Sequence, residues 1–166
     1  MTSDLPAYRE WAENPTSEPV AYSVIIPAYN EAIRILPTVA AIAVHISSLG
    51  KSWELIVADD GSTDNTVELL DGLNLANLHV LRAKTNSGKG SAVRRGVLAA
   101  RGEVILFADA DQSTSIEHFG DLLVEIDRGD DVAIGSRSVE GATVENKSLV
   151  RKVLSSGAKL MVRFRL

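Results

Sequence analysis

Residues 22–31 read YSVIIPAYNE, a short apolar run that ends in a polar loop. Valine, isoleucine and tyrosine favour β-strands, and a strand that is buried on both faces is apolar along its whole length. The same change from an apolar run to a polar loop recurs further along the chain. It predicts five strands, at residues 22–27, 53–59, 78–82, 104–108 and 132–136.

Segments with helical spacing separate these runs. The first predicted helix has Pro37 in its first turn and Gly50 at its C-terminal stop. Its apolar face comprises Val39, Ile42, Ala43, Ile46 and Leu49. A second helix is expected after Asp64 and a third over residues 88–100. The buried side of the third comprises Ala92, Val93, Gly96, Val97 and Ala100.

The fourth helix is predicted to begin at Thr114. Thr114 and Glu117 have the spacing of a capping box, in which each side chain accepts from the other residue's backbone N–H. Apolar residues on one face then continue the helix: Ile116, Phe119, Leu123 and Ile126. Because apolar strands alternate with helices, we predict an α/β fold, a Rossmann-like and mostly parallel sheet with helices on both faces.

Polar residues follow the predicted strands. In parallel sheets of this kind, ligands bind beyond the carboxyl ends of the strands. The candidate segments are residues 28–31, 59–62 and 109–111, together with Arg137. We expect all four to open on one edge of the sheet.

The composition is that of one globular domain, with 45% hydrophobic and 23% charged residues in 166. No run approaches the roughly 18 apolar residues of a membrane span, and residues 1–19 lack the apolar core of a signal peptide. We therefore expect the chain in the cytoplasm or on the cytoplasmic side of a membrane, with no nucleic acid as a partner. With no cysteine and three scattered histidines, a metal ion would be held by oxygen atoms.

Charge is divided unevenly along the chain. Residues 147–166 hold six of the 17 basic residues and no acid, so residues 1–146 hold 11 basic and 22 acidic residues, which gives −11 for that part and +6 for the tail. We predict that residues 147–166 form a basic amphipathic helix that meets phosphate groups or an anionic membrane surface. A core helix with a solvated basic face is the alternative.

Asp109 and Asp111 follow the run at 104–108 with one residue between them. Two carboxylates in one cleft repel each other unless a cation neutralises them. Mg²⁺ and Mn²⁺ prefer oxygen ligands, and Mg²⁺ commonly binds one or two carboxylates together with substrate phosphates. The pair is therefore a candidate site for a metal ion and a diphosphate, although the same spacing also occurs in acidic loops and helix caps.

Two adjacent acids, Asp59 and Asp60, end the second predicted strand. Turn and capping chemistry explains the residues that follow them. It explains the acids less well, and their carboxylates could accept hydrogen bonds from a base N–H or from ribose hydroxyls.

The sequence NSGKG at residues 86–90 opens the third helix. It could bring Lys89, Arg94 or Arg95 toward phosphate oxygens, and an exposed basic helix start is the alternative reading. The spacing is not that of a P-loop.

Together these segments resemble family 2 glycosyltransferases of the GT-A fold, in particular the polyprenyl- and dolichyl-phosphate sugar transferases. The similarity covers residues 22–151. The family's PxYNE, DDGS, NxGKGxA, DAD and GSR motifs correspond to residues 27–31, 59–62, 86–92, 109–111 and 135–137. The resemblance implies an inverting, metal-dependent hexosyltransferase that moves a sugar from a nucleotide diphosphate to a polyprenyl or dolichyl phosphate.

The resemblance also implies roles for individual residues. The nucleotide sugar would be bound by Pro27, Ala28, Tyr29, Glu31, Asp59, Asp60, Lys89, Asp109, Ala110 and Asp111. Asp109 and Asp111 would hold Mg²⁺ or Mn²⁺, and Arg137 and Arg151 would bind the acceptor phosphate. These four residues are the candidate catalytic set.

One departure from the family pattern bears on the donor. Mannosyl-type members commonly place a metal-binding glutamine two residues after the second aspartate, where this chain has Ser113, and Gln112 lies one residue earlier. Gln112 is then the candidate third ligand. The departure favours UDP-glucose as the donor, with GDP-mannose next.

The expected organisation is an N-terminal extension at residues 1–20, a nucleotide-sugar-binding GT-A domain at 21–146 and the basic helix at 147–166. That helix would begin an acceptor- or membrane-facing region, since the family's catalytic domain usually continues further.

Three other functions stay open. One is a family 2 enzyme with a different sugar or lipid acceptor, for which a hydroxyl group would need a base. The second is a phosphohydrolase in which Asp109 attacks phosphate and Asp111 serves as acid or base. The third is a non-catalytic nucleotide-binding or receiver-like module. The last two would normally carry their acids after the first strand.

Overall fold

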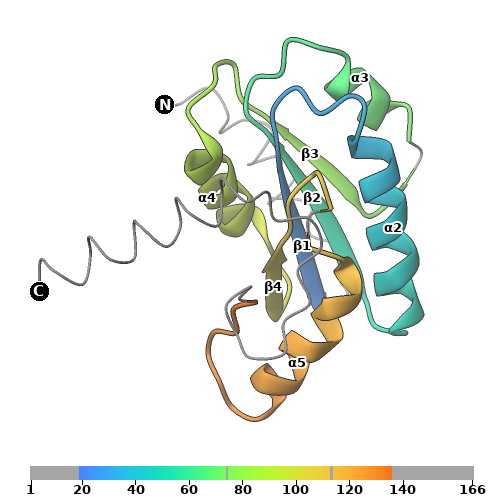
Figure 1. The fold of residues 1–166 in the computed structure, drawn as a ribbon, viewed down its shortest axis with the longest axis vertical. Helices are drawn as coiled ribbons and strands as arrows, with labels where there is room; N and C mark the ends of the chain where they lie inside the picture. The colour runs from blue at the N-terminus through green and yellow to red at the C-terminus, as the bar shows by residue number, and fades with distance from the viewer. Residues whose placement is uncertain (1–18, 74, 113, 136–166) are drawn as a thin grey trace, which may run out of the picture. The chain divides into compact units, whose positions relative to one another are not determined.

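The computed structural model describes residues 19–73, 75–112 and 114–135. The chain divides into two compact units, Met1–Asp121 and Leu122–Leu166. The first unit contains a parallel sheet of four strands in the order β3-β2-β1-β4 (Figure 1). The predicted α/β fold is confirmed.

The strand bounds agree closely with the sequence prediction. The four strands are β1 (Tyr22–Ala28), β2 (Trp53–Asp59), β3 (Leu78–Arg82) and β4 (Val104–Phe107). β1 and β2 lie at the centre of the sheet, and their side chains are buried along nearly the whole run. This is why they read as continuous apolar segments rather than as alternating ones.

Helices cover both faces of the sheet (Figure 1). α4 (Lys89–Ala99) packs on β1 and β2, while α2 (Ile35–Ser48) packs on β2 and on the short α3 (Thr66–Asp71). On the α4 side the core contains Ile25, Ile56 and Ala99.

Small residues allow α4 to approach the sheet closely. A Cβ atom at Gly96 would lie 2.3 Å from Cγ2 of Ile25, so the helix could not hold this position with a larger residue there. The buried residues of α4 are Ala92, Gly96 and Ala99. Val97, predicted on the buried side, is 42% exposed, because the next residue along a helix is turned by about 100° from Gly96.

The first predicted helix is confirmed. Its buried side contains Val39, Ile42 and Ile46, as expected, and also Thr38. The chain leaves α2 through Gly50, whose φ of 65° lies in the left-handed region that glycine adopts most easily.

The predicted start of the fourth helix is wrong. A 3₁₀ turn, η1 (Ile116–His118), comes first and α5 (Phe119–Asp127) follows. Ser115 rather than Thr114 caps the turn, since its extended backbone lets the hydroxyl accept from the Glu117 N–H at 3.4 Å. In the first unit the ring of Phe119 packs edge-on against Tyr22, with the ring centroids 5.3 Å apart.

In the second unit α5 ends at a glycine. Gly129 has a φ of 105°, and the N–H groups of Gly129 and Asp130 donate to the carbonyls of Ile126 and Glu125 at 2.9 and 3.2 Å. This pattern is a Schellman motif, which satisfies the last carbonyls of a helix.

The strand predicted at residues 132–136 is wrong for residues 132–135, which form no strand. Val132 and Ile134 are exposed by 72% and 82%. A strand needs a neighbour for its backbone N–H and C=O groups, and no described residue pairs with this segment. Apolar alternation alone could not reveal this.

The predicted basic helix at 147–166 and residues 1–18 of the predicted N-terminal extension lie outside the described residues. Within residues 19–135, leaving out 74 and 113, the structure has no helix that is both long and apolar enough to cross a membrane.

Candidate functional site

The strand order places a switch point at β1. From β1 the chain moves to β2 and β3 on one side of the sheet and then returns to β4 on the other side. The order of the strands therefore reverses between β1 and β4, and ligands bind in the crevice at such a point, beyond the carboxyl ends of the strands.

A tight turn carries the acid pair at the end of β4. The Gln112 N–H donates to the Asp109 carbonyl at 3.3 Å, with Ala110 and Asp111 at the centre of the turn. The Ala108 N–H donates to the Ile25 carbonyl at 2.9 Å, which anchors the start of the turn beside β1. The Asp109 side chain is 40% exposed and Asp111 is exposed, so solvent reaches both carboxylates.

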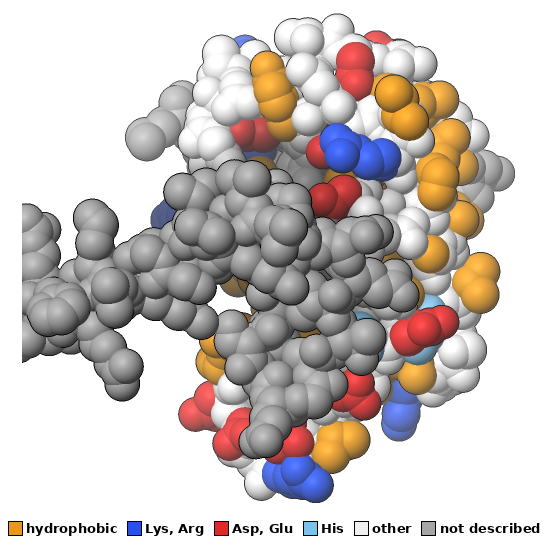
Figure 2. Space-filling view, viewed as in Figure 1, with side chains coloured by type: hydrophobic (Ala, Val, Ile, Leu, Met, Phe, Trp, Pro, Cys, Tyr) orange, Lys and Arg blue, Asp and Glu red, His pale blue; other side chains and the backbone are white. Residues whose placement is uncertain are grey.

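Lys89 lies at the acid pair. Its ammonium group forms an ion pair with the Asp109 carboxylate. The structure thus brings together two residues that the sequence assigned to the nucleotide-sugar site, one from the start of α4 and one from the end of β4. Acidic and basic side chains also lie close together on the face shown in Figure 2.

Asp60 is a buried carboxylate that holds the start of α4. One oxygen accepts from the N–H groups of Ser87 and Gly88, at 2.9 and 2.6 Å, and the other from both terminal nitrogens of Arg95 at 3.2 Å. A negative charge at a helix N-terminus is favourable because the free N–H groups there carry positive partial charge. Asp60 therefore fixes the helix end that presents Lys89.

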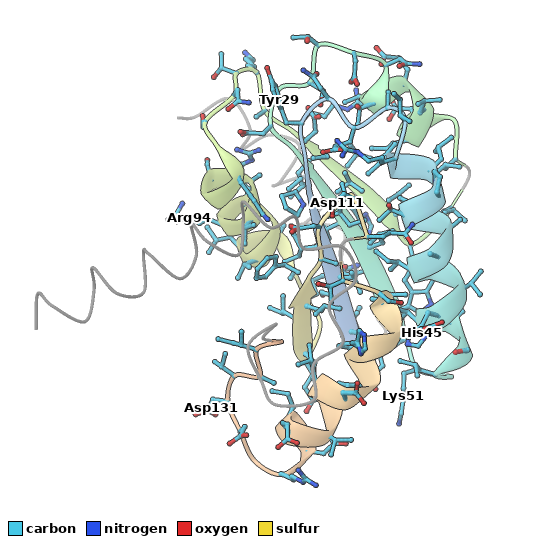
Figure 3. The ribbon with its side chains drawn as sticks, in the orientation of Figure 1. Tyr29, His45, Lys51, Arg94, Asp111 and Asp131 are labelled. Atoms are coloured by element: carbon cyan, nitrogen blue, oxygen red, sulfur yellow. The ribbon has the colours of Figure 1, made fainter. Side chains whose placement is uncertain are left out.

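Arg95 is thus directed at a protein carboxylate. It also donates to the Asp59 carbonyl at 3.0 Å and to the Ser91 hydroxyl at 3.3 Å. The three basic residues that could reach phosphate therefore differ: Lys89 lies at Asp109, Arg95 at Asp60, and Arg94 points away from Asp111 (Figure 3).

Asp59 shapes the turn after β2. Its carboxylate accepts from the N–H groups of Gly61 and Ser62 at 3.1 and 3.2 Å. Gly61 has a φ of 78°, and a Cβ there would lie 2.9 Å from the carbonyl carbon of Thr85. The turn after β2 and the loop after β3 are therefore in backbone contact.

Hydrogen bonds join the loop after β1 to the same turn. The Asn30 side-chain oxygen accepts from the Thr63 N–H at 2.8 Å, and the Glu31 N–H donates to the Thr66 hydroxyl at 2.8 Å. Asn30 has a φ of 55°, which asparagine tolerates better than most residues. Glu31 forms an ion pair with Arg34 at 2.7 Å.

Asp64 completes these contacts. Its carboxylate accepts from the Thr66 hydroxyl and N–H at 2.5 and 3.0 Å and from the Ala32 N–H at 3.2 Å. Burial raises the pKa of Asp64, but these hydrogen bonds outweigh burial and hold the pKa below its ordinary value of 3.8. The loops after β1 and β2 are therefore held together by a charged group.

The other residues assigned to the nucleotide sugar also lie at strand ends. Pro27 and Ala28 end β1, where the Ala28 carbonyl accepts from the Asp60 N–H at 2.8 Å. Tyr29 is 44% exposed beyond β1 (Figure 3). Arg137 and Arg151 lie outside the described residues.

Sequence reasoning missed Thr38. This buried residue of α2 donates from its hydroxyl to the Ala110 carbonyl at 2.7 Å. The one signal for it was a polar residue on the buried helix face, beside Val39. Gln112, the candidate third ligand, donates from its side-chain nitrogen to this hydroxyl at 3.3 Å.

The carboxylate oxygen atoms at this site suit a divalent cation that is bound together with a diphosphate. Asp109 and Asp111 supply oxygen atoms from a single turn. Within the described part of the chain, no three histidine, aspartate or glutamate side chains form a group that could hold a metal by themselves. A cation here would complete its coordination with water and substrate phosphates, as Mg²⁺ commonly does.

The sequence profile of "Glycosyl transferase family 2" matches residues 23–165. The chain belongs to this family. The match spans all the loops described above, and the acid pair follows β4, whereas the alternative phosphohydrolase and receiver-like module would normally carry their acids after the first strand.

Curated relatives in the family carry related names. A dolichyl-phosphate beta-glucosyltransferase of Dictyostelium discoideum is 37% identical over 85% of this chain and 48% of its own length. A dolichol-phosphate mannosyltransferase of Pyrococcus furiosus is 38% identical over 87% of this chain and 41% of its own. The chain thus spans about half the length of these relatives.

Solved structures show the same fold. One of them is S. aureus TarS, residues 1–349, in complex with UDP-GlcNAc. It superposes on this chain with a TM-score of 0.53 and is 31% identical in sequence, over 66% of this chain and 32% of its own. The parallel sheet with helices on both faces is therefore the GT-A fold expected of this family.

Proposed function

We propose that this chain is the donor-binding part of an inverting hexosyltransferase that moves a hexose from a nucleotide diphosphate sugar to a polyprenyl or dolichyl phosphate. The observation that carries the proposal is the ion pair between Lys89 and Asp109. It lies beside the switch point of the sheet, in the turn that also carries Asp111. The relatives' names support a lipid phosphate as acceptor. The proposed donor is UDP-glucose, and GDP-mannose is the second candidate.

Asp109 and Asp111 hold Mg²⁺ or Mn²⁺ in this proposal. The bound ion supplies positive charge to the departing nucleoside diphosphate. With a cation at Asp109, the Lys89 ammonium group would be available to contact a phosphate oxygen of the donor. The rest of the nucleotide-sugar set surrounds the nucleoside, with Tyr29 and Glu31 contributed by the loop after β1 and Asp59 and Asp60 by the end of β2.

A lipid phosphate acceptor removes the need for a general base. A phosphate monoester has a second pKa near ~6 and is already largely anionic at neutral pH. The protein must instead bring this anion to an anionic donor and align the attack with the leaving group. We assign that task to Arg137 and Arg151, since a guanidinium group binds two phosphate oxygens in a fixed geometry and stays charged.

The proposed organisation places this reaction at the cytoplasmic side of a membrane. Residues 21–146 form the donor-binding domain, residues 1–20 precede it, and residues 147–166 form a basic amphipathic helix that faces the membrane and the acceptor. Each basic residue near an anionic leaflet contributes about 1 kcal/mol to binding. Three engaged residues of the six in this tail would give roughly 3 kcal/mol before ordering costs.

Calorimetric titration tests the donor half of the proposal. UDP-glucose and GDP-mannose are each titrated into the chain with Mn²⁺ and with EDTA, and UDP-glucose is expected to bind more tightly and only with the metal. Polyprenyl phosphate and the preferred donor are then supplied together, and formation of the glycolipid is measured. Absence of metal-dependent binding for both donors would reject the proposed site.

Two further assays separate the alternatives. Hydrolysis of a simple phosphate ester without any nucleotide sugar would favour a phosphohydrolase. Transfer to a sugar hydroxyl rather than to the lipid phosphate would favour a different acceptor within the family.

A further inference from the structure

Thr38 connects α2 to the turn that carries the acid pair. It is 1% exposed and lies on the sheet-facing side of α2, the helix that follows β1. Its hydroxyl oxygen is 2.7 Å from the Ala110 carbonyl oxygen and 3.3 Å from the side-chain nitrogen of Gln112. Both partners are more than 70 residues away in the sequence.

A threonine inside a helix usually donates its hydroxyl to the carbonyl four residues earlier. Here that acceptor is the Arg34 carbonyl at 2.9 Å, and the Ala110 carbonyl is nearer. The hydroxyl donates one proton and can accept, so it can serve both Ala110 and Gln112. A hydroxyl buried at this position thus has partners on a loop that follows a different strand.

The turn needs such a restraint. Gln112 has a φ of 52°, a conformation that residues with a side chain adopt infrequently. Ala110 is buried, and among the described residues the Thr38 hydroxyl is the hydrogen-bond partner of its carbonyl, so loss of the hydroxyl removes that bond. Thr38 therefore binds the turn at its centre and at its end, with Asp111 between the two contacts.

We propose that Thr38 is a positioning residue for Asp109 and Asp111. It spans the switch point from the β1 side and fixes the peptide between the two acids, so that their carboxylates stay in place before any ligand arrives. The inference rests on the proposed role of these acids in binding a metal ion and a diphosphate. Substitution of a residue that orients metal ligands without touching the ion commonly lowers metal affinity by about 10–100-fold.

Three variants test the proposal. Thr38→Val keeps the shape and removes the hydroxyl, Thr38→Ser keeps the hydroxyl, and Ile42→Val trims a buried residue one turn further along the same helix. Melting temperature, Mn²⁺ affinity from the electron paramagnetic resonance signal of free Mn²⁺, and calorimetric affinity for Mn²⁺ with UDP are measured for each.

We expect Thr38→Val to weaken Mn²⁺ and metal-dependent UDP binding by about 10-fold or more, and Thr38→Ser to stay within about 3-fold of wild type. Ile42→Val should lower the melting temperature and leave both affinities unchanged. Unaltered affinity in Thr38→Val, or losses in Thr38→Val and Ile42→Val alike, would overturn the inference. Absence of binding in the wild type would instead count against the proposed function.

A measurement on the wild-type chain covers the case in which Thr38→Val does not fold. The methyl resonances of Thr38 and Val39 are followed by NMR while Mg²⁺ and UDP are added. The Thr38 methyl signal is expected to shift, because its hydroxyl contacts the turn, and the Val39 signals to stay in place. A shift at neither residue in the presence of bound ligand would reject the positioning role.

Discussion

Lys89 and Asp109 form an ion pair that joins the first turn of α4 to the end of β4. Both side chains are partly exposed, so the pair contributes little to stability by itself. Its importance is electrostatic, since the ammonium group is paired with a carboxylate that would also bind a divalent cation. We therefore infer competition between Lys89 and the cation for Asp109.

Lys89→Met should reveal this competition. Removal of a single positive charge about 4 Å from a divalent cation in water is worth roughly 2 kcal/mol, or about 30-fold in affinity. We expect Mn²⁺ alone to bind more tightly by about this factor, and Mn²⁺ with UDP to bind more weakly because a phosphate contact is lost. Lys89→Arg keeps the charge and serves as the control. Equal Mn²⁺ affinity in Lys89→Met and wild type would show that the ion pair does not oppose the metal.

Asp111→Asn is expected to abolish metal-dependent UDP binding. The substitution removes one of the two negative charges that hold the cation and leaves the shape of the turn nearly unchanged. Calorimetry with and without Mn²⁺ measures the effect. Asp121→Asn, at an exposed acid of α5, is the matched control and should bind as the wild type does.

Arg137→Ala should distinguish binding of the donor from transfer to the acceptor. We expect it to retain metal-dependent UDP binding and to lose transfer to polyprenyl phosphate. Full transfer by both Asp111→Asn and Arg137→Ala would contradict the roles proposed for both residues.

The sequence was sufficient to predict the central strands and the position of the acid pair, because those features depend on local patterns. β1 and β2 are buried on both sides, so their apolar runs show directly where they lie. Asp109 and Asp111 follow the apolar run of β4, which is apolar in sequence although Ile105 and Phe107 are exposed. The parallel order of the sheet then brings their loop beside the one after β1.

Contacts between distant segments were not predictable in this way. Thr38 lies in an apolar helix pattern, and nothing near it in the sequence indicates Ala110 as its partner. The sequence suggested a role at the nucleoside for Asp60, but it did not indicate that the Asp60 carboxylate also accepts hydrogen bonds from the start of α4 and from Arg95. The strand expected at residues 132–136 had a suitable pattern, but strands are defined by their neighbours.

Asp60→Asn should destabilise the fold strongly. It leaves the guanidinium of Arg95, whose side chain is only 18% exposed, without its counter-charge, and loss of one member of a buried pair costs on the order of 3 kcal/mol. Urea unfolding measures the change. Asp71→Asn breaks the exposed ion pair with Arg82 and should cost about 1 kcal/mol or less. Similar losses in the two variants would mean that burial does not distinguish these pairs.

Two glycines of α4 should respond to alanine in opposite directions. Gly96→Ala places a Cβ atom 2.3 Å from Ile25, and we expect a loss of about 1–3 kcal/mol in the free energy of unfolding from overpacking. Gly90→Ala meets nothing within 4 Å and should raise stability by up to about 1 kcal/mol, because alanine favours the helix. Thermal and urea unfolding of both variants decide the matter, and stabilisation by Gly96→Ala would refute the close packing of α4 on β1.

His79 should make stability depend on pH. Burial lowers its pKa below 6.5; Glu54, whose carboxylate lies 3.7 Å from the ring, raises it, and Arg101 lowers it further. The unfolded chain therefore binds a proton at His79 at a higher pH than the folded chain does. The stability that neutral, buried His79 contributes is complete above pH 6.5 and is lost as the pH falls from 6.5 toward the folded pKa.

Urea unfolding at pH 7.5 and 5.5 measures this effect. The difference in the free energy of unfolding between the two pH values should be smaller for His79→Gln than for the wild type. His118→Gln, at an exposed histidine, is the control. The same pH dependence in His79→Gln and wild type would place the titrating group elsewhere.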